Sequence, residues 1–529
     1  MLFTSWEFLL FIGILFLIYY LIPKRGQWIL LLCASLLFYY FAAPIGLVYM
    51  AVTVFATWLI ALRIDKLRAE SAAYFKTELA KASPQEKKAF KEKSKKRFNK
   101  YLVLCIVIDL GLLFVLKYAN FVLTGVNALF FRASEGLTFA NLAAPMGISF
   151  YTLSALGYVI DITHGKYRAE RNPAKFALYV SFFPTVVQGP ISRFEEVSKT
   201  LYAPHAYDAQ NVMRGLMRIA WGYFKKLVIA DRMLVAVSVL SGDPEAYMGA
   251  WSLCLLVFYT VQIYADFTGG IDITIGIAQV FGVKLQENFD RPFFSKSIAE
   301  YWRRWHISMG SWFRDYVFYP ISASKGLLKL AKNSRKKLGD GFGRRLSVYV
   351  STIVVWFITG LWHGASMNFI VWGLLNGVII MIATELAPLF DRFHNKYPDL
   401  LKKDLYKGMQ AARTVAITAC LRMLDLNTSV AVTFRRFGSI FTTANYHIFT
   451  DGSILSLGLS GADYIIILVG ILVMFAVSLL ACRKTVMDRL EKRGYAAVYA
   501  CFALLIVLTL VFGAYGIGYD SSQFIYNQF

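Results

Sequence analysis

The stretch Tyr349–Trp372, YVSTIVVWFITGLWHGASMNFIVW, decides what kind of fold this chain can adopt. It is apolar and long enough to cross a bilayer, yet it contains His363 within Leu361-Trp362-His363-Gly364. An ionisable side chain at membrane depth is costly, so we interpret His363 as a candidate functional residue. The alternative is a structural histidine bonded to a neighbouring helix, because buried polar groups are usually satisfied.

A second histidine, His306, lies in the sequence YWRRWHIS, directly after Trp305. Both histidines directly follow a tryptophan, and arginines lie close to one of them. This pattern favours a catalytic role for the two histidines over a purely structural one. On a continuous helix, Trp302, His306 and Gly310 would share a face because they are four residues apart. The surrounding segment, residues 287–320, is too polar for a lipid-facing span. This composition is typical of a re-entrant or interfacial segment that lines a wet cavity.

The composition indicates an all-α polytopic membrane protein. The chain has 529 residues, of which 57% are hydrophobic and 17% charged, whereas soluble domains average about 45–50% and about 25%. At about 20 residues per span, the apolar runs predict about eleven to thirteen membrane-embedded helices. We expect one integral membrane domain over residues 1–529, with a catalytic core segment at residues 287–377.

The net charge of +23 resides mainly in short loops between apolar runs, as the positive-inside rule predicts for cytoplasmic loops. Nucleic acid is therefore not an expected partner, and the lipid bilayer is. Residues 64–100 form the most basic loop, and their Ala, Glu and Lys content predicts a cytoplasmic helical hairpin at the membrane surface. The simpler interpretation, a solvated loop that only sets the topology, is the one we favour, and we assign this segment no catalytic role.

Two carboxylates, Asp266 and Asp272, interrupt another apolar run, and we expect them to pair with basic residues in a structural role. The six cysteines include no Cys-x-x-Cys pair. They predict neither a disulfide framework nor a metal site.

Four stretches together resemble the membrane-bound O-acyltransferase family, in particular its bacterial branch that acetylates alginate. They are Met146-Gly147-Ile148-Ser149-Phe150-Tyr151, Gln188-Gly189-Pro190-Ile191-Ser192-Arg193, residues 287–316 around His306, and Leu361-Trp362-His363-Gly364. The tail ending in Phe524-Ile525-Tyr526 is also similar. The chain departs from that branch at Ala265, where the branch tends to have an aromatic residue.

The resemblance implies a ring of tilted helices around a central funnel, in the cytoplasmic membrane of a bacterium. An acyl thioester, such as acetyl-CoA, would enter from the cytoplasm and meet an acceptor hydroxyl from the other side. No permanently bound cofactor or metal is implied. The branch usually works with a separate extracytoplasmic acetyltransferase that delivers the acyl group to an exported polysaccharide. His363 matches the family's near-invariant histidine, and His306 matches a position that is His, Asn or Asp.

Acyl transfer to a hydroxyl needs a base, donors for the oxyanion and exclusion of water. A buried neutral histidine suits the first role. We predict His363 as general base and His306 as the residue that orients the acceptor or stabilises the oxyanion. Arg303 and Arg304 could contact donor phosphates, or they could pair with Asp290 or Glu300. The predicted substrate-binding residues are Trp302, Arg303, Arg304, Ser308, Trp362, Gln188, Arg193 and Asn288.

Several alternatives remain open at this level. A covalent acyl-enzyme could form on a serine near the motifs, namely Ser149, Ser192, Ser308 or Ser366. The acyl group could be D-alanine, transferred from a carrier protein toward teichoic acid. In a third class, the chain would be a proton-coupled transporter that uses the histidines as relays, although the sequence lacks paired broken helices in two halves.

Overall fold

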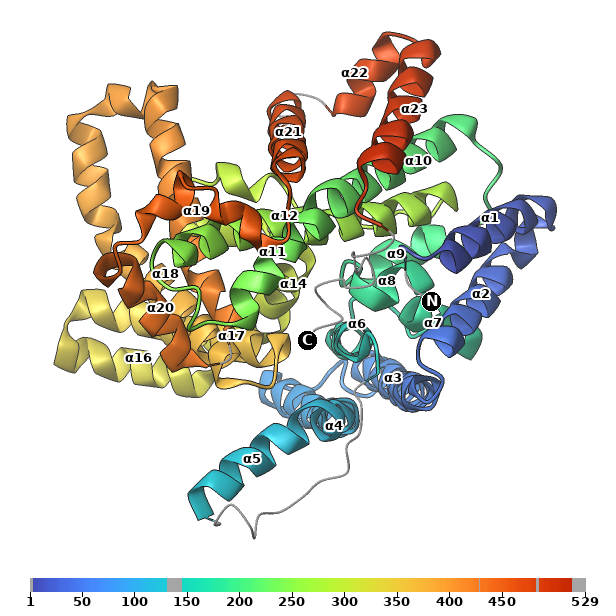
Figure 1. Cartoon of the computed structure of the whole chain (residues 1–529). Helices are drawn as coiled ribbons and strands as arrows, with labels where there is room; N and C mark the ends of the chain where they lie inside the picture. Colours follow the sequence, from blue (N-terminus) through green and yellow to red (C-terminus); the bar gives the residue numbers. More distant parts are fainter. Residues whose placement is uncertain (1–2, 131–144, 428, 482–484, 516–529) are drawn as a thin grey trace. The chain divides into compact units, whose positions relative to one another are not determined.

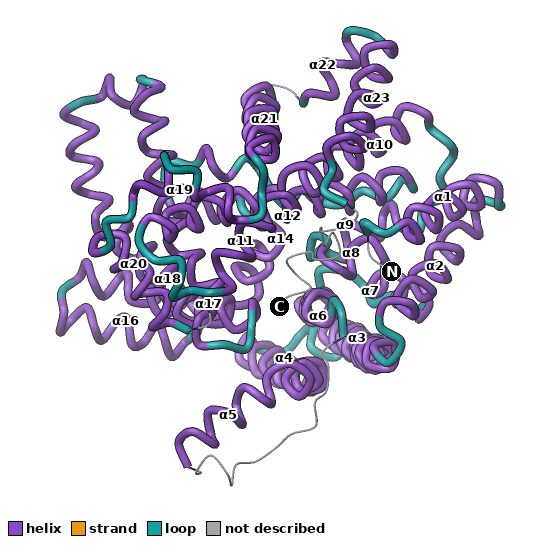
Figure 2. The backbone as a smooth tube through the Cα atoms, in the orientation of Figure 1, coloured by secondary structure: helices purple, strands orange, loops and turns teal. Residues whose placement is uncertain are grey.

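A computed structural model describes residues 3–130, 145–427, 429–481 and 485–515, so the tail motif at Phe524–Tyr526 lies outside the described residues. Within these ranges the chain is helical and has no β-strand (Figure 2). Eight of the described helices are long and apolar enough to cross a membrane, and Trp6–Leu21 is a shorter apolar helix. The predicted all-α, multi-pass class is confirmed. The long helices are fewer than the predicted spans, because regions such as 176–188 form short, broken helices.

The described chain divides into two compact units. The first comprises Met1–Met213 and Ile277–Gln286. Its helices (Figure 1) are α1 (Trp6–Leu21), α2 (Gln27–Ala42), α3 (Gly46–Lys76), α4 (Pro84–Leu113), α5 (Ala119–Phe130), α6 (Ile148–His164), α7 (Pro173–Ser181), α8 (Phe183–Gln188) and α9 (Phe194–Leu201).

The second unit comprises Arg214–Gly276 and Glu287–Phe529. Its helices are α11 (Asp231–Gly242), α13 (Ile298–Arg304), α14 (Ile307–Phe313), α15 (Tyr319–Ser322), α16 (Lys325–Leu338), α17 (Asp340–His363), α18 (Met367–Lys396), α19 (Asp404–Leu426), α20 (Val430–Thr442), α21 (Gly461–Leu480), α22 (Val486–Lys492) and α23 (Tyr495–Phe512). Helices α10 (Ala209–Tyr223) and α12 (Ala250–Val280) contribute to both units. We predicted a single functional domain and a ring of helices around a funnel. Both features would require the two units together, so they stay predictions.

The basic segment at residues 64–100 forms the predicted helical hairpin from the ends of α3 and α4. The turn between them ends in a capping box, in which the Ser83 hydroxyl accepts from the Glu86 N–H (3.2 Å) and the Glu86 carboxylate accepts from the Ser83 N–H (2.8 Å). This reciprocal pair satisfies two helix-terminal donors and fixes where α4 begins. Because Pro84 follows directly, the helix start is also pre-organised by its fixed φ.

Helix α12 is the most enclosed of the long apolar helices, with 67% of its most apolar stretch buried. Its two carboxylates are paired, as predicted. Asp266 contacts the Lys226 ammonium at 2.7 Å, and Asp272 accepts from Arg218 (2.9 Å) and Lys225 (2.6 Å). Lys226 is fully buried, and a buried charge persists only when it is paired. These pairs therefore link α12 to the segment 214–230 that precedes α11.

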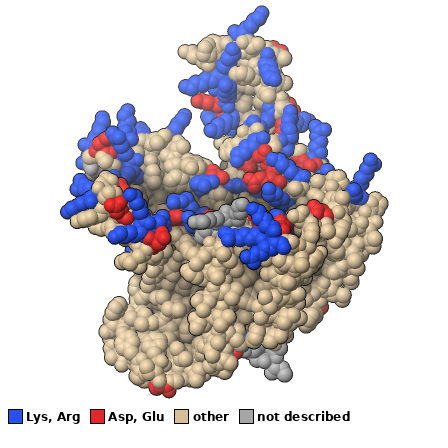
Figure 3. All heavy atoms as spheres, turned by 90° about the horizontal axis from the view of Figure 1, so that it is seen from above, with Lys and Arg blue, Asp and Glu red and all other residues tan. Residues whose placement is uncertain are grey.

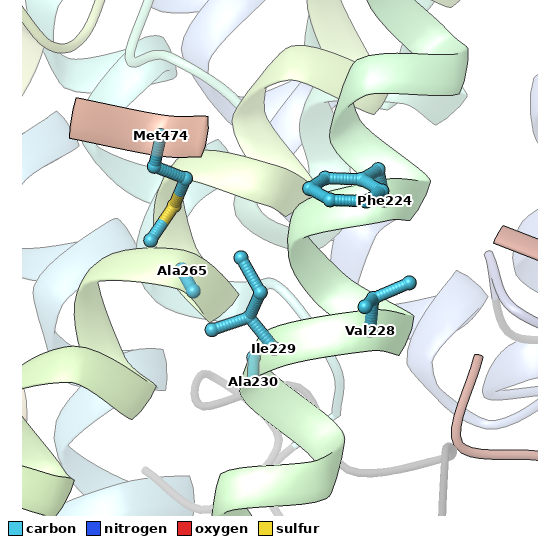
Figure 4. Close-up of a cluster of buried hydrophobic side chains, with 6 residues drawn as sticks. All are labelled: Phe224, Val228, Ile229, Ala230, Ala265 and Met474. Atoms are coloured by element: carbon cyan, nitrogen blue, oxygen red, sulfur yellow. The ribbon is translucent and has the colours of Figure 1, made fainter. Parts of the chain in front are cut away.

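An apolar cluster surrounds the same segment (Figure 4). Four of its residues come from the π-helical turn at Phe224–Ala230, one from α12 and one from α21. The cluster consists of Phe224, Val228, Ile229, Ala230, Ala265 and Met474. Ala265 is fully buried there, so this departure from the alginate branch lies in the packed core.

Candidate active site

His306 lies in a sharp break between α13 and α14. An isolated antiparallel bridge joins Phe289 to Trp305. On either side of it, the Asp290 N–H donates to the Arg304 carbonyl and the Ile307 N–H donates to the Asn288 carbonyl, each at 3.0 Å. His306 adopts φ 49° and ψ 53°, in the left-handed region that a non-glycine residue rarely occupies. Such strain is of order 1–3 kcal/mol and clusters at functional sites.

The predicted continuous helix through Trp302, His306 and Gly310 is therefore wrong. Helix α13 ends at Arg304 and α14 begins at Ile307, so these three residues do not share a helical face. The physical reason is the bridge to Phe289, which holds Trp305 in an extended conformation (φ −103°, ψ 127°). A contact with a strand-like segment 16 residues upstream overrides local helix propensity here.

Asn288 fixes the orientation and the tautomer of His306. Its Oδ1 atom accepts from the Ser308 N–H (3.0 Å) and the Ser308 hydroxyl (2.9 Å), and it lies 3.2 Å from Nδ1 of His306. A backbone N–H can only donate, which assigns the oxygen to this side of the amide. Nδ1 must then carry the proton, and Nε2 of His306 keeps its lone pair.

His306 is fully buried. Its ring lies against Phe267, with ring centroids 5.0 Å apart in an edge-to-face arrangement. Burial lowers the pKa of His306 to about 3, because desolvation disfavours the charged imidazolium. The side chain is therefore neutral throughout the physiological pH range.

His363 is the last residue of α17, and Gly364 leaves the helix in an extended conformation. The half-buried imidazole stacks on Phe369 (ring centroids 6.2 Å apart) and meets Trp372 edge-on at 4.8 Å. Phe369 and Trp372 belong to α18, which lies beside α17 (Figure 1). The helix C-terminus carries partial negative charge, which favours an imidazolium whenever one forms there.

A close crossing of α17 and α18 holds His363 in this position. A Cβ atom added to Gly360 would lie 2.4 Å from the Phe369 carbonyl oxygen, and one added to Gly373 would lie 2.2 Å from the Trp356 carbonyl oxygen. Only glycine fits at both positions. As in other membrane helices with small residues at their contact, the missing side chains let the two backbones approach closely.

The two histidines share one neighbour, Trp362. Its indole centroid lies 5.9 Å from the His306 ring and 5.2 Å from the His363 ring. The fold therefore places His306 and His363, which are 57 positions apart in sequence, next to the same tryptophan side chain. Trp362 was predicted as a substrate-binding residue, and it is buried between the two imidazoles.

The predicted residues of α13 have different environments. Trp302 donates its indole N–H to Asn376 (3.0 Å) and packs against Trp356 and Trp372, so its polar edge already serves the α13–α18 contact. Arg304 forms an ion pair with Glu300 at 2.7 Å, which is the structural alternative considered above. Arg303 is exposed, and within the described residues it has no ion pair.

Gln188 and Arg193 belong to the first unit. Gln188 is the last residue of α8 and is fully buried, and Arg193 precedes the first turn of α9. The left-handed Gly147 (φ 74°) packs against α8 so closely that a Cβ atom there would lie 1.9 Å from the Val186 carbonyl oxygen. The structure therefore joins two of the four motifs that carry the resemblance.

One residue near His306 was not singled out from the sequence. Arg422 of α19 places its guanidinium 4.3 Å from the centroid of the Trp305 ring, and it donates to the Tyr301 hydroxyl at 3.2 Å. Asp425 lies 3.5 Å from the same guanidinium. The sequence did contain a signal for this residue, because Arg422 is the one charged residue in the apolar run at residues 415–424. A charge in such a run needs a partner within the protein.

Among the described residues, no group of three or more His, Cys, Asp or Glu side chains could hold a metal ion.

Comparison with known proteins identifies the family. Residues 167–333 match the family model of MBOAT, the membrane-bound O-acyltransferase family. A protein of Azotobacter vinelandii named "Probable alginate O-acetylase AlgI" is 34% identical over 395 residues, which are 73% of this chain and 69% of that protein.

Two further relatives differ in their named acceptors. The peptidoglycan O-acetyltransferase of Helicobacter pylori is 30% identical over 57% of this chain and 58% of its own length. The teichoic acid D-alanyltransferase of Bacillus subtilis is 26% identical over 49% of this chain and 62% of its own length. The predicted enzyme class is thereby confirmed. The chain belongs to the membrane-bound O-acyltransferase family and is a multi-pass membrane acyltransferase.

Proposed function

We propose that this protein moves an acetyl group from a cytoplasmic thioester donor, such as acetyl-CoA, toward a polysaccharide outside the bacterial cytoplasmic membrane. The observation that carries the proposal is the meeting of His306 and His363 at Trp362. The names of the acetylating relatives support the acetyl group and a polysaccharide acceptor. A separate extracytoplasmic acetyltransferase would complete delivery to the sugar.

His363 is the general base in this mechanism. It removes the proton of the acceptor hydroxyl as the oxygen attacks the thioester carbonyl. The C–O bond forms, the C–S bond then breaks, and the imidazolium returns the proton to the departing thiolate. The C-terminus of α17 stabilises the imidazolium while it exists. General-base catalysis of this kind typically contributes about 10²–10⁴-fold.

His306 orients the acceptor. With Nδ1–H directed at Asn288, its Nε2 lone pair can accept a hydrogen bond from a hydroxyl. A lone pair would repel a developing oxyanion, so of the two predicted roles we favour orientation over oxyanion stabilisation. The lowered pKa of His306 keeps Nε2 unprotonated.

Trp372 is our candidate oxyanion donor. Its indole N–H is buried and has no acceptor among the described residues, and its ring lies 4.8 Å from that of His363. A buried donor without a partner needs an explanation. A transient acceptor, the carbonyl oxygen of the tetrahedral intermediate, provides one. Arg303 remains the proposed contact for donor phosphates.

Membranes that contain the full chain test the proposal when incubated with radiolabelled acetyl-CoA and, separately, with radiolabelled D-alanyl carrier protein. We expect label to appear in extractable polysaccharide from the acetyl donor only. Transfer from the D-alanyl carrier alone would overturn the acetyl assignment and favour the activity named for the Bacillus subtilis relative.

The same incubation separates direct transfer from a covalent intermediate. In direct transfer, denatured protein carries no label. Label that stays on denatured protein would indicate an acyl-enzyme on one of the four candidate serines. Ser308 is the candidate nearest His306, and it donates its hydroxyl to Asn288.

A further inference from the structure

A basic cleft opens between the adjoining ends of α3 and α4 and the last turn of α6. It has a volume of about 500 Å³. Five basic side chains line it, and none of its lining residues is a carboxylate. The five are Arg68, Lys76, Lys91, Lys95 and His164.

Contacts between the helices hold the walls of this cleft in place. The rings of Tyr74 and Phe90 lie 5.1 Å apart and join the two helices of the hairpin. Arg68 donates to the Thr163 carbonyl at 2.7 Å, which fixes α3 to the end of α6. Gly165 (φ 76°) makes room for that guanidinium, since a Cβ atom there would lie 1.8 Å from it. The basic groups are therefore carried by a fixed framework.

The charge in the cleft is not balanced by the protein. No carboxylate of the described residues lies within 4.0 Å of the ammonium groups of Lys76, Lys91 or Lys95. Nearby basic residues outside the cleft do have such partners, for example Lys166 with Asp161 at 2.7 Å. Lys91 and Lys95 are four apart on α4, and like charges at this spacing repel. A bound anion would relieve that repulsion.

Phosphate is the anion that this lining fits best. Lysine and arginine supply charge-assisted donors, and Ser71, Ser94 and Asn99 add neutral ones. Two of the helices that form the cleft, α3 and α4, continue into apolar spans, so we expect the cleft to lie at the depth of lipid headgroups. On the face that Figure 3 shows, many Lys and Arg side chains gather together, as basic residues do where they contact lipid headgroups.

We propose that this cleft binds the phosphate of an anionic phospholipid. The inference goes beyond acyl transfer and does not depend on it. The test uses the full-length protein in zwitterionic phosphatidylcholine nanodiscs. Short-chain phosphatidylglycerol, short-chain phosphatidylcholine, inorganic phosphate and coenzyme A are titrated separately, and binding is followed by calorimetry.

Two variants with equal loss of charge distinguish a site from general surface charge. The cleft variant carries K76Q, K91Q and K95Q. The matched control carries K81Q, K88Q and K93Q, from exposed positions of the same hairpin that do not line the cleft. We expect saturable phosphatidylglycerol binding that weakens about tenfold or more in the cleft variant and less than about twofold in the control. Replacing the same three cleft lysines by arginine should retain binding.

Equal weakening in the two glutamine variants would overturn the proposal, because diffuse charge would then explain the binding. Phosphate or coenzyme A binding as tight as that of phosphatidylglycerol, and equally sensitive to the cleft variant, would also overturn it, since the ligand would then be a soluble phosphate. Size-exclusion profiles identical to that of the unaltered protein establish that each variant is folded.

Discussion

His306 and His363 contact the same tryptophan but are held in opposite ways. His306 is fully buried in a strained turn between two short helices, and the Asn288 amide fixes its ring through a hydrogen bond. His363 is half-buried at the end of a 24-residue helix and is held by aromatic rings. One imidazole is held in a single tautomer by a hydrogen bond, and the other is half-buried and held by ring contacts alone.

This difference suggests a division of labour. A group that must gain and lose a proton in each turnover needs an environment that tolerates both charge states. A group that only accepts a hydrogen bond benefits from a fixed tautomer and from a pKa too low for protonation. On this argument, substitutions around the two residues should have different consequences for rate and pH dependence.

The largest effect is expected from H363A. Loss of the general base should lower kcat by about 10²–10⁴-fold while the protein still reaches the membrane in normal amount. Acetyl transfer from labelled acetyl-CoA measures the rate, and immunoblotting measures abundance. H394A is the control, because His394 lies on α18 and hydrogen-bonds Tyr406 outside the proposed site. Near-normal transfer by H363A would contradict the assignment.

The W372F variant should have the next largest effect. It keeps a ring beside His363 but removes the buried indole N–H, and loss of one oxyanion donor typically lowers kcat by about 10²–10³-fold. W356F, from the same apolar cluster, should change kcat by less than about threefold. If both variants lose activity equally, Trp372 acts through packing alone.

The N288D variant tests the locked tautomer through pH. A carboxylate next to Nδ1 favours the imidazolium, so the pKa of His306 should rise above its value of about 3 in the unaltered protein. Protonation removes the Nε2 lone pair, and activity should therefore decline as pH falls toward 5, by up to about tenfold relative to the unaltered enzyme.

The pH–rate profile between pH 5 and 8 measures this decline. S308A serves as the control, because it removes one hydrogen bond to Asn288 and adds no charge. A profile for N288D that is parallel to that of the unaltered protein would indicate that His306 takes no part in binding or chemistry.

The smallest effect is expected at Arg303. If its exposed guanidinium contacts donor phosphates, R303Q should raise KM for acetyl-CoA about three- to tenfold and leave kcat unchanged. R304Q breaks the ion pair with Glu300 instead, and it should lower thermal stability slightly without changing KM. An unchanged KM in R303Q would leave Arg303 as a surface charge.

Much of the fold followed from sequence pattern. Long apolar runs gave the membrane class, and the Lys-rich segment at residues 64–100 gave the helical hairpin, because both signals are local and strong. The pairing of Asp266 and Asp272 was also predicted, since an unpaired carboxylate in an apolar helix is unstable. Both histidines were selected as candidates from their local context, and both rings lie near Trp362 in the structure.

The architecture around His306 could not be predicted in the same way. Local propensity favoured one helix through Trp302 and His306, and only the bridge between Phe289 and Trp305 explains the break. Asn288 was expected to touch substrate, whereas its Oδ1 atom contacts Ser308 and His306. Arg422 reaches Trp305 from more than 100 residues away in sequence. Contacts of this range leave no periodic signal in the chain.

The left-handed backbone at position 306 has an evolutionary consequence. Any amino acid that replaces this histidine must first tolerate φ near 49°, and besides glycine the residues that do so most readily are asparagine, aspartate and histidine itself. The backbone conformation of the turn therefore limits substitution at position 306 to a few small or polar residues, independently of any catalytic requirement. Each member of that list except glycine has a side chain that can hydrogen-bond a hydroxyl group, so the geometry of the main chain favours a polar side chain at this position even when the residue changes.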